Sequence, residues 1–131
     1  MTDDIDKFIQ ACKNGDIEQV KRLMKIVDPS VDDNWAICIA SSRCHLNVVR
    51  LLLTDSRVDP SEDDNFSIRW ASIHGHLEVV RLLLEDPRVD PTARNNCAMR
   101  SAHWSIRDKI TQLFTEHMYR LDGPEYTRGI L

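Results

Sequence analysis

The sequence predicts an all-α protein, a solenoid of about four helix-turn-helix units joined by short loops. Three observations lead to this fold class. A segment of 31 residues recurs without a gap, each copy holds two stretches of helical apolar spacing, and an Asp-Pro step interrupts the pattern near the end of each copy. Repeats of this length are typical of architectures in which neighbouring units stack to bury a shared core.

The repeat is clearest between residues 32–62 and 63–93, which are identical at 19 of 31 positions. Chance alone gives about two identities from average residue frequencies. The period continues downstream, and a copy shorter by two residues precedes it. We therefore divide a repeat domain at 1–121 into four units and predict a C-terminal tail at 122–131. The units are 1–31, 32–62, 63–93 and 94–121.

The first helix of each unit is expected to begin at an asparagine. Asn34, Asn65 and Asn96 lie one period apart, and asparagine is a favourable N-cap because its side-chain oxygen accepts a backbone N–H that the helix leaves unpaired. Apolar residues follow at helical spacing, with small alanines where neighbouring helices approach. These helices are expected to end near Cys44, Gly75 and Ile106.

The second helix of each unit carries a wider apolar stripe, as in Leu77, Val80, Leu83 and Leu84. Proline in the Asp-Pro steps pushes the preceding residue out of the α region, so the helix cannot continue through them. The first and last helices are each polar on one side, and we expect them to cap the two ends of the stack.

The segments GHLEVVRLLL at 75–84 and HLNVVRLLL at 45–53 resemble the core of the ankyrin repeat, and the resemblance covers roughly residues 5–121. It implies a non-enzymatic module whose concave face and loop tips bind a protein. It also implies a left-handed residue at the turn between the paired helices, where Cys44 replaces glycine. The 31-residue period implies short finger loops, the loops that join the second helix of one unit to the first helix of the next. The D-N-x-A-I and R-V-D-P variant of the pattern is similar to ankyrin proteins of giant viruses and protists.

Composition excludes several functional classes. The net charge of −4 offers no basic face for nucleic acid, and no apolar run is long enough to span a bilayer. The four cysteines form no C-x-x-C pair or zinc spacing, which indicates free thiols in the cytoplasm or the nucleus. No nucleophile elbow, phosphate-binding glycine loop or H-E-x-x-H motif is present. We expect no catalytic residue and no cofactor.

The histidines are the strongest metal candidates, in the run His74-Gly75-His76. Two histidines without a cysteine or carboxylate partner make no closed metal site. The resemblance also implies that His45 and His76 are structural residues at the inter-helix turn. We therefore predict no metal.

Partner contact is expected from two groups of residues. The acidic pairs at the loop tips either complement the positive end of the following helix or steer a basic partner. Aromatic and apolar residues on the outer side of the first helices can act as anchors, because tryptophan combines a large apolar surface with a polar N–H. For Trp35, Phe66 and Trp70 we favour the alternative that they fill gaps between adjacent first helices, whereas for Ile73 and Trp104 we favour binding. The complete set is Asp32, Asp33, Arg43, Asp63, Asp64, Trp70, Ile73, His74 and Trp104.

The function predicted from these residues is recognition of a partner protein by a monomeric module, without nucleic acid or membrane. The alternative is a structural or self-associating repeat protein in which apolar patches pair two copies.

Overall fold

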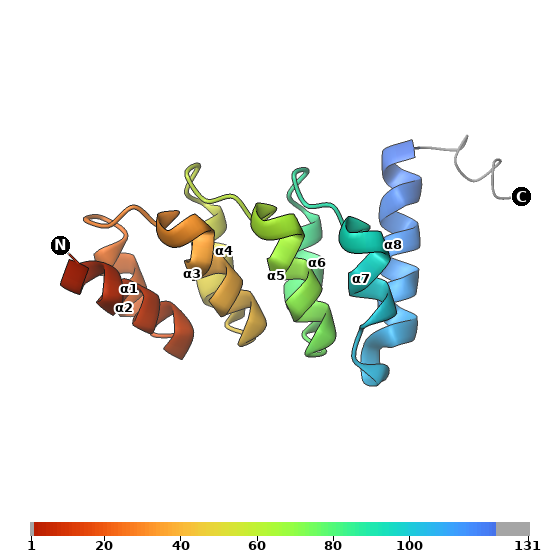
Figure 1. Cartoon of the computed structure of the whole chain (residues 1–131), viewed down its shortest axis with the longest axis horizontal. Coiled ribbons are helices and arrows are strands. Elements are labelled where there is room, and N and C mark those ends of the chain that lie inside the picture. Colours follow the sequence, from red (N-terminus) through yellow and green to blue (C-terminus); the bar gives the residue numbers. More distant parts are fainter. Residues whose placement is uncertain (1, 123–131) are drawn as a thin grey trace, which may run out of the picture.

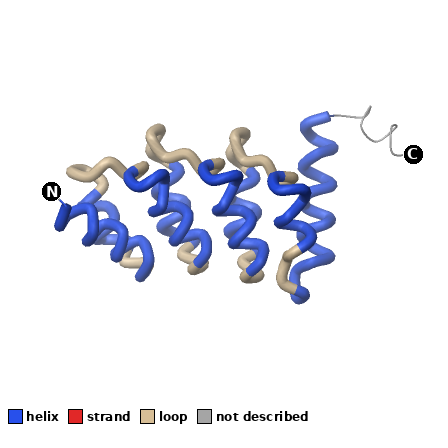
Figure 2. Tube along the Cα trace, in the orientation of Figure 1, coloured by secondary structure: helices blue, strands red, loops and turns tan. Residues whose placement is uncertain are grey.

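The computed structural model describes residues 2–122 and shows helices arranged as an elongated stack of four antiparallel pairs (Figure 1). No strand occurs in this part of the chain, and the remaining residues form turns and loops (Figure 2). The predicted all-α solenoid is confirmed. Its helices are α1 (Thr2–Asn14), α2 (Ile17–Leu23), α3 (Val31–Ser42), α4 (Leu46–Leu53), α5 (Glu62–Ile73), α6 (Leu77–Leu84), α7 (Ala93–Arg100) and α8 (Arg107–Asp122), with a 3-10 turn η1 (Trp104–Ile106) before α8.

The helices form two parallel rows. The first helices of the units, α1, α3, α5 and α7, contact one another in order, and the second helices, α2, α4, α6 and α8, lie behind them (Figure 1). The core lies between the rows and consists mainly of aliphatic residues at equivalent positions, such as Val49, Val80, Ile37 and Ile68. No unit could bury these side chains alone, so each depends on its neighbours.

A left-handed residue joins the two helices of each of the first three units, as predicted. Gly15 and Gly75 have φ values of 75° and 81°, and Cys44 has φ 64°. Only glycine adopts this region without a steric penalty from Cβ. Cys44 is exposed and free, so its side chain gives little packing in return.

Replacing Cys44 by glycine is therefore expected to stabilise the protein by about 1 kcal/mol, since it removes the left-handed penalty and outweighs the extra freedom of the unfolded chain. Urea unfolding should show a higher midpoint with an unchanged slope. A lower midpoint would mean that the thiol contributes packing that exceeds the backbone strain.

The predicted start of the first helices needs correction. Before right-handed helix begins, three consecutive residues adopt left-handed conformations in units 2, 3 and 4: 32–34, 63–65 and 94–96. In unit 2 a backbone hydrogen bond closes the turn that contains the run: the Asn34 N–H donates to the Ser30 carbonyl at 2.9 Å. Asparagine and aspartate tolerate this region better than other non-glycine residues, which explains why the D-D-N triplet recurs.

Asn34 and Asn65 do not cap their own helices. The Asn34 Oδ1 atom accepts the backbone N–H of Asp59 at 2.8 Å, and Asn65 accepts that of Asp90 at 2.8 Å. Both asparagines are buried, with exposed fractions of 6% and 7%. Each one ties the finger loop of its unit to the start of the first helix, a bond across 25 residues that local capping rules do not anticipate.

Unit 4 departs from the expected helix length. Its first helix was expected to reach Ile106 but ends at Arg100, and η1 follows. Ile106 occupies the position of Gly75, and a β-branched residue is strongly disfavoured at positive φ. The tight turn is replaced by a 3-10 turn that the His103 ring caps, because its Nδ1 accepts the Ser105 backbone N–H at 3.2 Å.

The two ends of the stack carry the predicted polar faces. On α8 the outward residues Lys109, Gln112, Thr115 and Glu116 are exposed, whereas Ile110 is buried against the stack. Residues 123–131 of the predicted tail lie outside the described residues.

Candidate functional site

The first-helix row presents a continuous line of aromatic rings. Trp35 on α3 contacts Phe66 on α5 with ring centroids 5.7 Å apart, and Phe66 stacks on Trp70 at 5.4 Å. Trp70 contacts His74 at 5.6 Å, and His74 stacks on His76 at 5.9 Å. We call these five residues the aromatic row. It runs from the finger end of the first helices to their turn end, and helical spacing of four residues between Phe66, Trp70 and His74 produces it.

Burial shows that the aromatic row both packs and remains accessible. Phe66 and Trp70 are half-buried, while Trp35 is 39% exposed and His74 is exposed. The contact between Trp35 and Phe66 crosses a unit boundary, which is the gap-filling arrangement considered for them. Their outer edges still face solvent and can contact a partner.

Trp104 lies at the turn end of unit 4, and 79% of it is exposed. It belongs to η1 and not to a first helix, because α7 ends early. Only the His103 ring, 5.5 Å away, packs on it as an aromatic neighbour within residues 2–122. Its large apolar surface and polar N–H are available to solvent, a combination that is enriched at protein interfaces.

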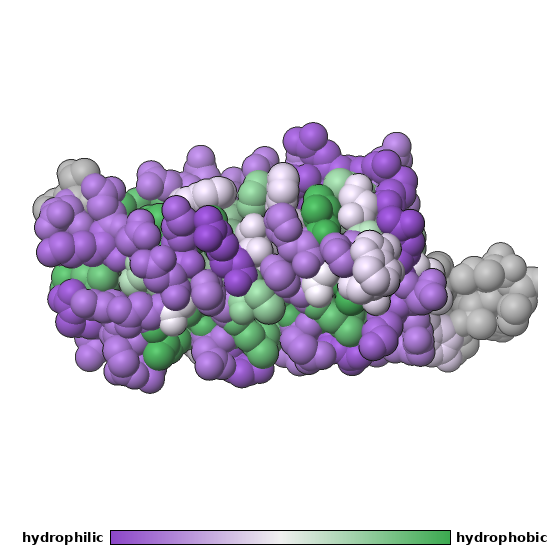
Figure 3. Space-filling view, turned by 90° about the horizontal axis from the view of Figure 1, so that it is seen from below, coloured by the Kyte–Doolittle hydropathy of each residue, from purple (hydrophilic) through white to green (hydrophobic). Residues whose placement is uncertain are grey.

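The remaining predicted residues separate into two groups. Arg43 and His74 cap the C-terminal ends of α3 and α5 and are exposed, and Ile73 beside them is half-buried. Figure 3 looks onto this turn end of the molecule and shows a mainly hydrophilic surface broken by separate pale and apolar patches. The acidic residues lie at the opposite, finger end.

All four predicted aspartates lie in the left-handed runs and are exposed: Asp32, Asp33, Asp63 and Asp64. Of these, Asp64 forms an ion pair with Arg94 of the next unit, at 3.1 Å. The left-handed backbone projects these side chains outward, so they are available to solvent and to a partner.

Three arginines that were not predicted belong to the same region: Arg69, Arg100 and Arg94, whose ion pair with Asp64 is given above. Arg69 lies over the Phe66 ring at 5.9 Å and donates to the backbone carbonyls of its own left-handed run. Arg100 makes the equivalent bonds in unit 4. Aligning the units shows arginine at 69 and 100 but cysteine at 38, a signal that could have drawn attention to this position.

The finger loops are held by local carboxylate bonds. The Asp55 carboxylate accepts three hydrogen bonds from Arg57, and Asp86 accepts three from Arg88. The hydrogen bonds from each arginine side chain lower the pKa of its aspartate. In unit 1, hydrogen bonds from Ser30 lower the pKa of Asp28 in the same way. These rigid loops hold the acidic runs in place beside the first helices.

Histidines link neighbouring units at the turn end. His45 Nε2 donates to the Lys13 carbonyl of unit 1, and His76 Nε2 donates to the Ser42 carbonyl of unit 2, both at 2.9 Å. The structural role implied for them is thus supported by geometry. Burial lowers the pKa of His76, and the nearby His74 and His45 lower it further, whereas the bond to Ser42 raises it.

Folding stability is expected to fall as the pH drops from 7 toward 5. Desolvation lowers the pKa of buried His117 as well as that of His76. The unfolded chain, with histidine pKa values near 6.5, therefore takes up protons that the folded chain rejects. The stabilising contribution is complete above that value and is lost as the pH falls toward the folded pKa. Urea unfolding across this range measures the slope.

His117→Gln and His76→Gln should each reduce that slope. The aspartates with lowered pKa titrate below the ordinary aspartate range, so they do not contribute in this window. An unchanged slope in both variants would contradict the assignment.

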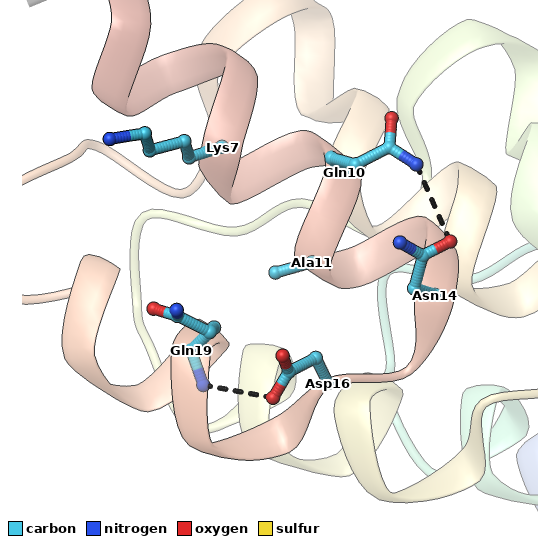
Figure 4. Close-up of a pocket in the computed structure, with 6 residues that line it drawn as sticks. All are labelled: Lys7, Gln10, Ala11, Asn14, Asp16 and Gln19. Carbon is cyan, nitrogen blue, oxygen red and sulfur yellow. Dashed lines mark hydrogen bonds between the residues drawn. The ribbon is translucent and has the colours of Figure 1, made fainter.

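The N-terminal end of the stack has a shallow hollow of ≈ 300 Å³ between α1 and α2. Figure 4 shows its polar lining, where Gln10 donates to Asn14 and the Gln19 N–H donates to Asp16. The Gln10 and Asn14 side chains bond each other, the Asp16 carboxylate accepts a backbone N–H, and Ala11 forms the floor. The hollow has no charged cluster and no enclosed volume suited to a small ligand.

No metal site is found in the described part of the chain. Residues 2–122 contain no group of three histidine, cysteine or acidic side chains placed to hold an ion. Burial raises the pKa of the Cys12 thiol to about 12 and that of Cys38 to about 11, so neither is a reactive thiolate. None of the described helices is both long and apolar enough to cross a bilayer.

A comparison with family models identifies residues 8–95 as ankyrin repeats (3 copies), a match that covers more than half of the chain. A search of the curated proteins finds no match. The matched segment contains most of α1, all of α2 to α6 and the aromatic row, and it ends at the start of α7, within the left-handed run of unit 4. The chain belongs to the ankyrin repeat family.

Proposed function

We propose that the protein binds a partner protein through the exposed side of its first-helix row, from the acidic runs at the finger end to Trp104 at the turn end. Ankyrin repeats generally serve as protein interaction modules. The observation that carries the proposal is the aromatic row, whose rings line this face and stay partly accessible. Large aromatic side chains beside charged ones are the composition of interface anchors.

The protein acts in this proposal without chemistry, as a monomer in the cytoplasm or nucleus that occupies a surface of its partner. The four free cysteines support a reducing compartment. The exposed large apolar residues of the described chain, Ile26, Trp35, Trp104 and Tyr119, are spread over units 1, 2 and 4, which does not favour one broad patch for self-association. Sedimentation at micromolar concentration tests the monomeric state.

Truncating Trp104 or Ile73 to alanine should weaken partner binding by about 1–3 kcal/mol, mainly through faster dissociation, as is usual for anchors. A partner captured by proximity labelling in native cells and then purified allows both rates to be measured by surface plasmon resonance. The Trp104 variant should keep the parent thermal midpoint because its side chain is mostly exposed. Unchanged affinity in both variants would place the contact elsewhere.

Converting Asp32, Asp33, Asp63 and Asp64 to asparagine should act differently. The association rate should fall and its salt dependence should flatten, because exposed charges steer the encounter with a charged partner. Asparagine keeps the tolerance for positive φ that these positions need. An unaltered salt dependence would show that the acidic runs do not guide the partner.

A further inference from the structure

Two arginines occupy the junction between units 3 and 4. Arg69 Nε donates to the Asp64 carbonyl at 3.0 Å, and its Nη2 donates to the Asp63 carbonyl at 3.1 Å, while its guanidinium lies over the Phe66 ring. Arg94 Nε contacts the Asp64 carboxylate at 3.1 Å. In the left-handed run of unit 3, one guanidinium group thus binds the backbone carbonyls and a second binds the Asp64 carboxylate.

Unit 4 repeats the backbone part of this arrangement. Arg100 Nε donates to the Asn95 carbonyl at 2.8 Å, and its Nη2 donates to the Arg94 carbonyl at 3.2 Å. A left-handed run in this fold thus presents two adjacent carbonyls at the spacing of one guanidinium edge. The same contact in two units with different side chains in the run shows that the backbone itself creates the acceptor pair.

Unit 2 has the same backbone without either arginine. Its run at 32–34 has φ values of 57°, 55° and 63°, matching those of units 3 and 4. One period before Arg69 stands Cys38, and one period before Arg94 stands Asp63. Across residues 2–122, no side chain donates to the carbonyls of Asp32 and Asp33.

The charge at this junction is reversed relative to the next one. The pair equivalent to Asp64 and Arg94 is Asp33 and Asp63, two carboxylates at positions that hold an ion pair one unit later. Burial is the main cause of the raised pKa of the Cys38 thiol, and the nearby charges of Asp63 and Glu62 raise it further, whereas the Ser67 hydrogen bond and the Arg69 charge lower it. Trp35, 39% exposed, stands where Phe66 supports Arg69.

We propose that the junction of units 2 and 3 binds an arginine side chain of the partner protein, at a site formed by the carbonyls of Asp32 and Asp33, the carboxylates of Asp33 and Asp63, and the Trp35 ring. We call this the arginine site. The inference rests on the proposed function and names the chemistry of the partner: an exposed arginine in a basic segment.

The geometry of the acceptors in the arginine site favours an arginine side chain over a lysine side chain as the bound group. A planar guanidinium can place two N–H groups on two adjacent carbonyls and lie flat on an aromatic ring, whereas an ammonium group is a point charge. The partner side chain would take the position that Arg69 takes in unit 3, and two carboxylates would neutralise it.

The probe is a terminally blocked Gly-Gly-Arg-Gly-Gly peptide, titrated into the ¹⁵N-labelled protein. Saturable shifts are expected at the amides of 32–36 and 62–66 and at the Trp35 indole N–H. The citrulline peptide, which keeps the shape but lacks the charge, should bind about tenfold more weakly or not at all. Equal shifts with both peptides, or shifts spread over α8, would overturn the proposal.

Two variants supply the missing arginines from within the chain. Asp63→Arg restores the pair seen between Asp64 and Arg94, and Arg94 already tolerates the φ of 56° that Asp63 adopts. Cys38→Arg restores the side chain that holds the carbonyls. Each should abolish peptide binding, and if one fails to fold the other still decides. Peptide binding unchanged in either folded variant would contradict the site.

A matched control moves the site by one unit. Arg69→Cys combined with Arg94→Asp gives the junction of units 3 and 4 the residues that stand at Cys38 and Asp63, and should add a second set of shifts at 63–67. With the purified partner, Asp63→Arg should weaken binding at least about tenfold. If Trp104→Ala weakens binding of the partner and Asp63→Arg does not, the arginine site is wrong and the proposed function stands. If neither variant weakens binding, the arginine site and the proposed function are both wrong.

Discussion

Replacing Gly15 by alanine is expected to destabilise the protein by about 2–3 kcal/mol, the sum of a left-handed backbone penalty and a lost hydrogen bond. Gly15 has φ 75°, and a Cβ built on it would lie 2.5 Å from Nδ1 of His45. The ring would have to move, and its bond to the Lys13 carbonyl joins units 1 and 2. Urea unfolding with the slope held common gives the change in free energy.

Gly75→Ala is the matched control. It has a similar φ of 81°, but its added Cβ would meet His103 Cβ at 3.2 Å, a contact that a small shift relieves. Its cost should stay near the conformational penalty of about 1 kcal/mol. In a His45→Ala background, Gly15→Ala should also fall to that value. Equal effects at Gly15 and Gly75 would show that the His45 contact does not matter.

Asn65→Ala is expected to cost about 2–4 kcal/mol, because it removes the acceptor of a buried N–H and puts alanine at positive φ. Asn65 has φ 62° and is 7% exposed, and its Oδ1 holds the Asp90 N–H. Without that bond the finger loop of unit 3 loses its tie to α5. Thermal and urea unfolding should both report the loss.

Two variants separate the bond from the backbone. Asn65→Gly keeps the positive φ and loses only the acceptor, so it should cost about 1–2 kcal/mol. Asn96→Ala tests the backbone penalty alone. Asn96 has φ 63°, but its side chain accepts no hydrogen bond from a finger loop within the described residues. It should pay only the backbone penalty. A glycine variant as stable as the parent would mean that the bond contributes nothing.

The repeated helices could be predicted from the sequence because their causes are local and periodic. Identity over 31 positions located the units, and the spacing of Leu83 and Val80 located a buried helix face. The left-handed turn at Cys44 followed from its alignment with two glycines. Such features depend on residues a few positions apart, which sequence patterns report directly.

The missed features depend on partners that are distant or on rare backbone states. The sequence predicts that Asn34 caps its own helix, yet its Oδ1 atom accepts the backbone N–H of Asp59, 25 residues later. Three left-handed residues in succession are too unusual to expect from D-D-N alone. Ile106 shortens α7 because it cannot replace a left-handed glycine, a substitution that alignment displays but does not interpret.

The candidate site was foreseen in part. The aspartates and Trp70 were named from their repeat positions, and the structure adds that Phe66 and Trp70 are linked in one aromatic row. Arg69 and Arg94 were passed over because single charged residues on a helix or loop usually face solvent. Their meaning emerged only when the carbonyls and carboxylate that they contact were located.

The histidine bonds between neighbouring units have a consequence for how the gene can change. His45 reaches only the preceding unit, and so does His76, while the asparagine bonds stay within a unit. We therefore expect that a tandem duplication of residues 63–93, in steps of 31 codons, would keep these histidine and asparagine bonds, although the new junction would pair Asp64 with a second Asp63 in place of Arg94.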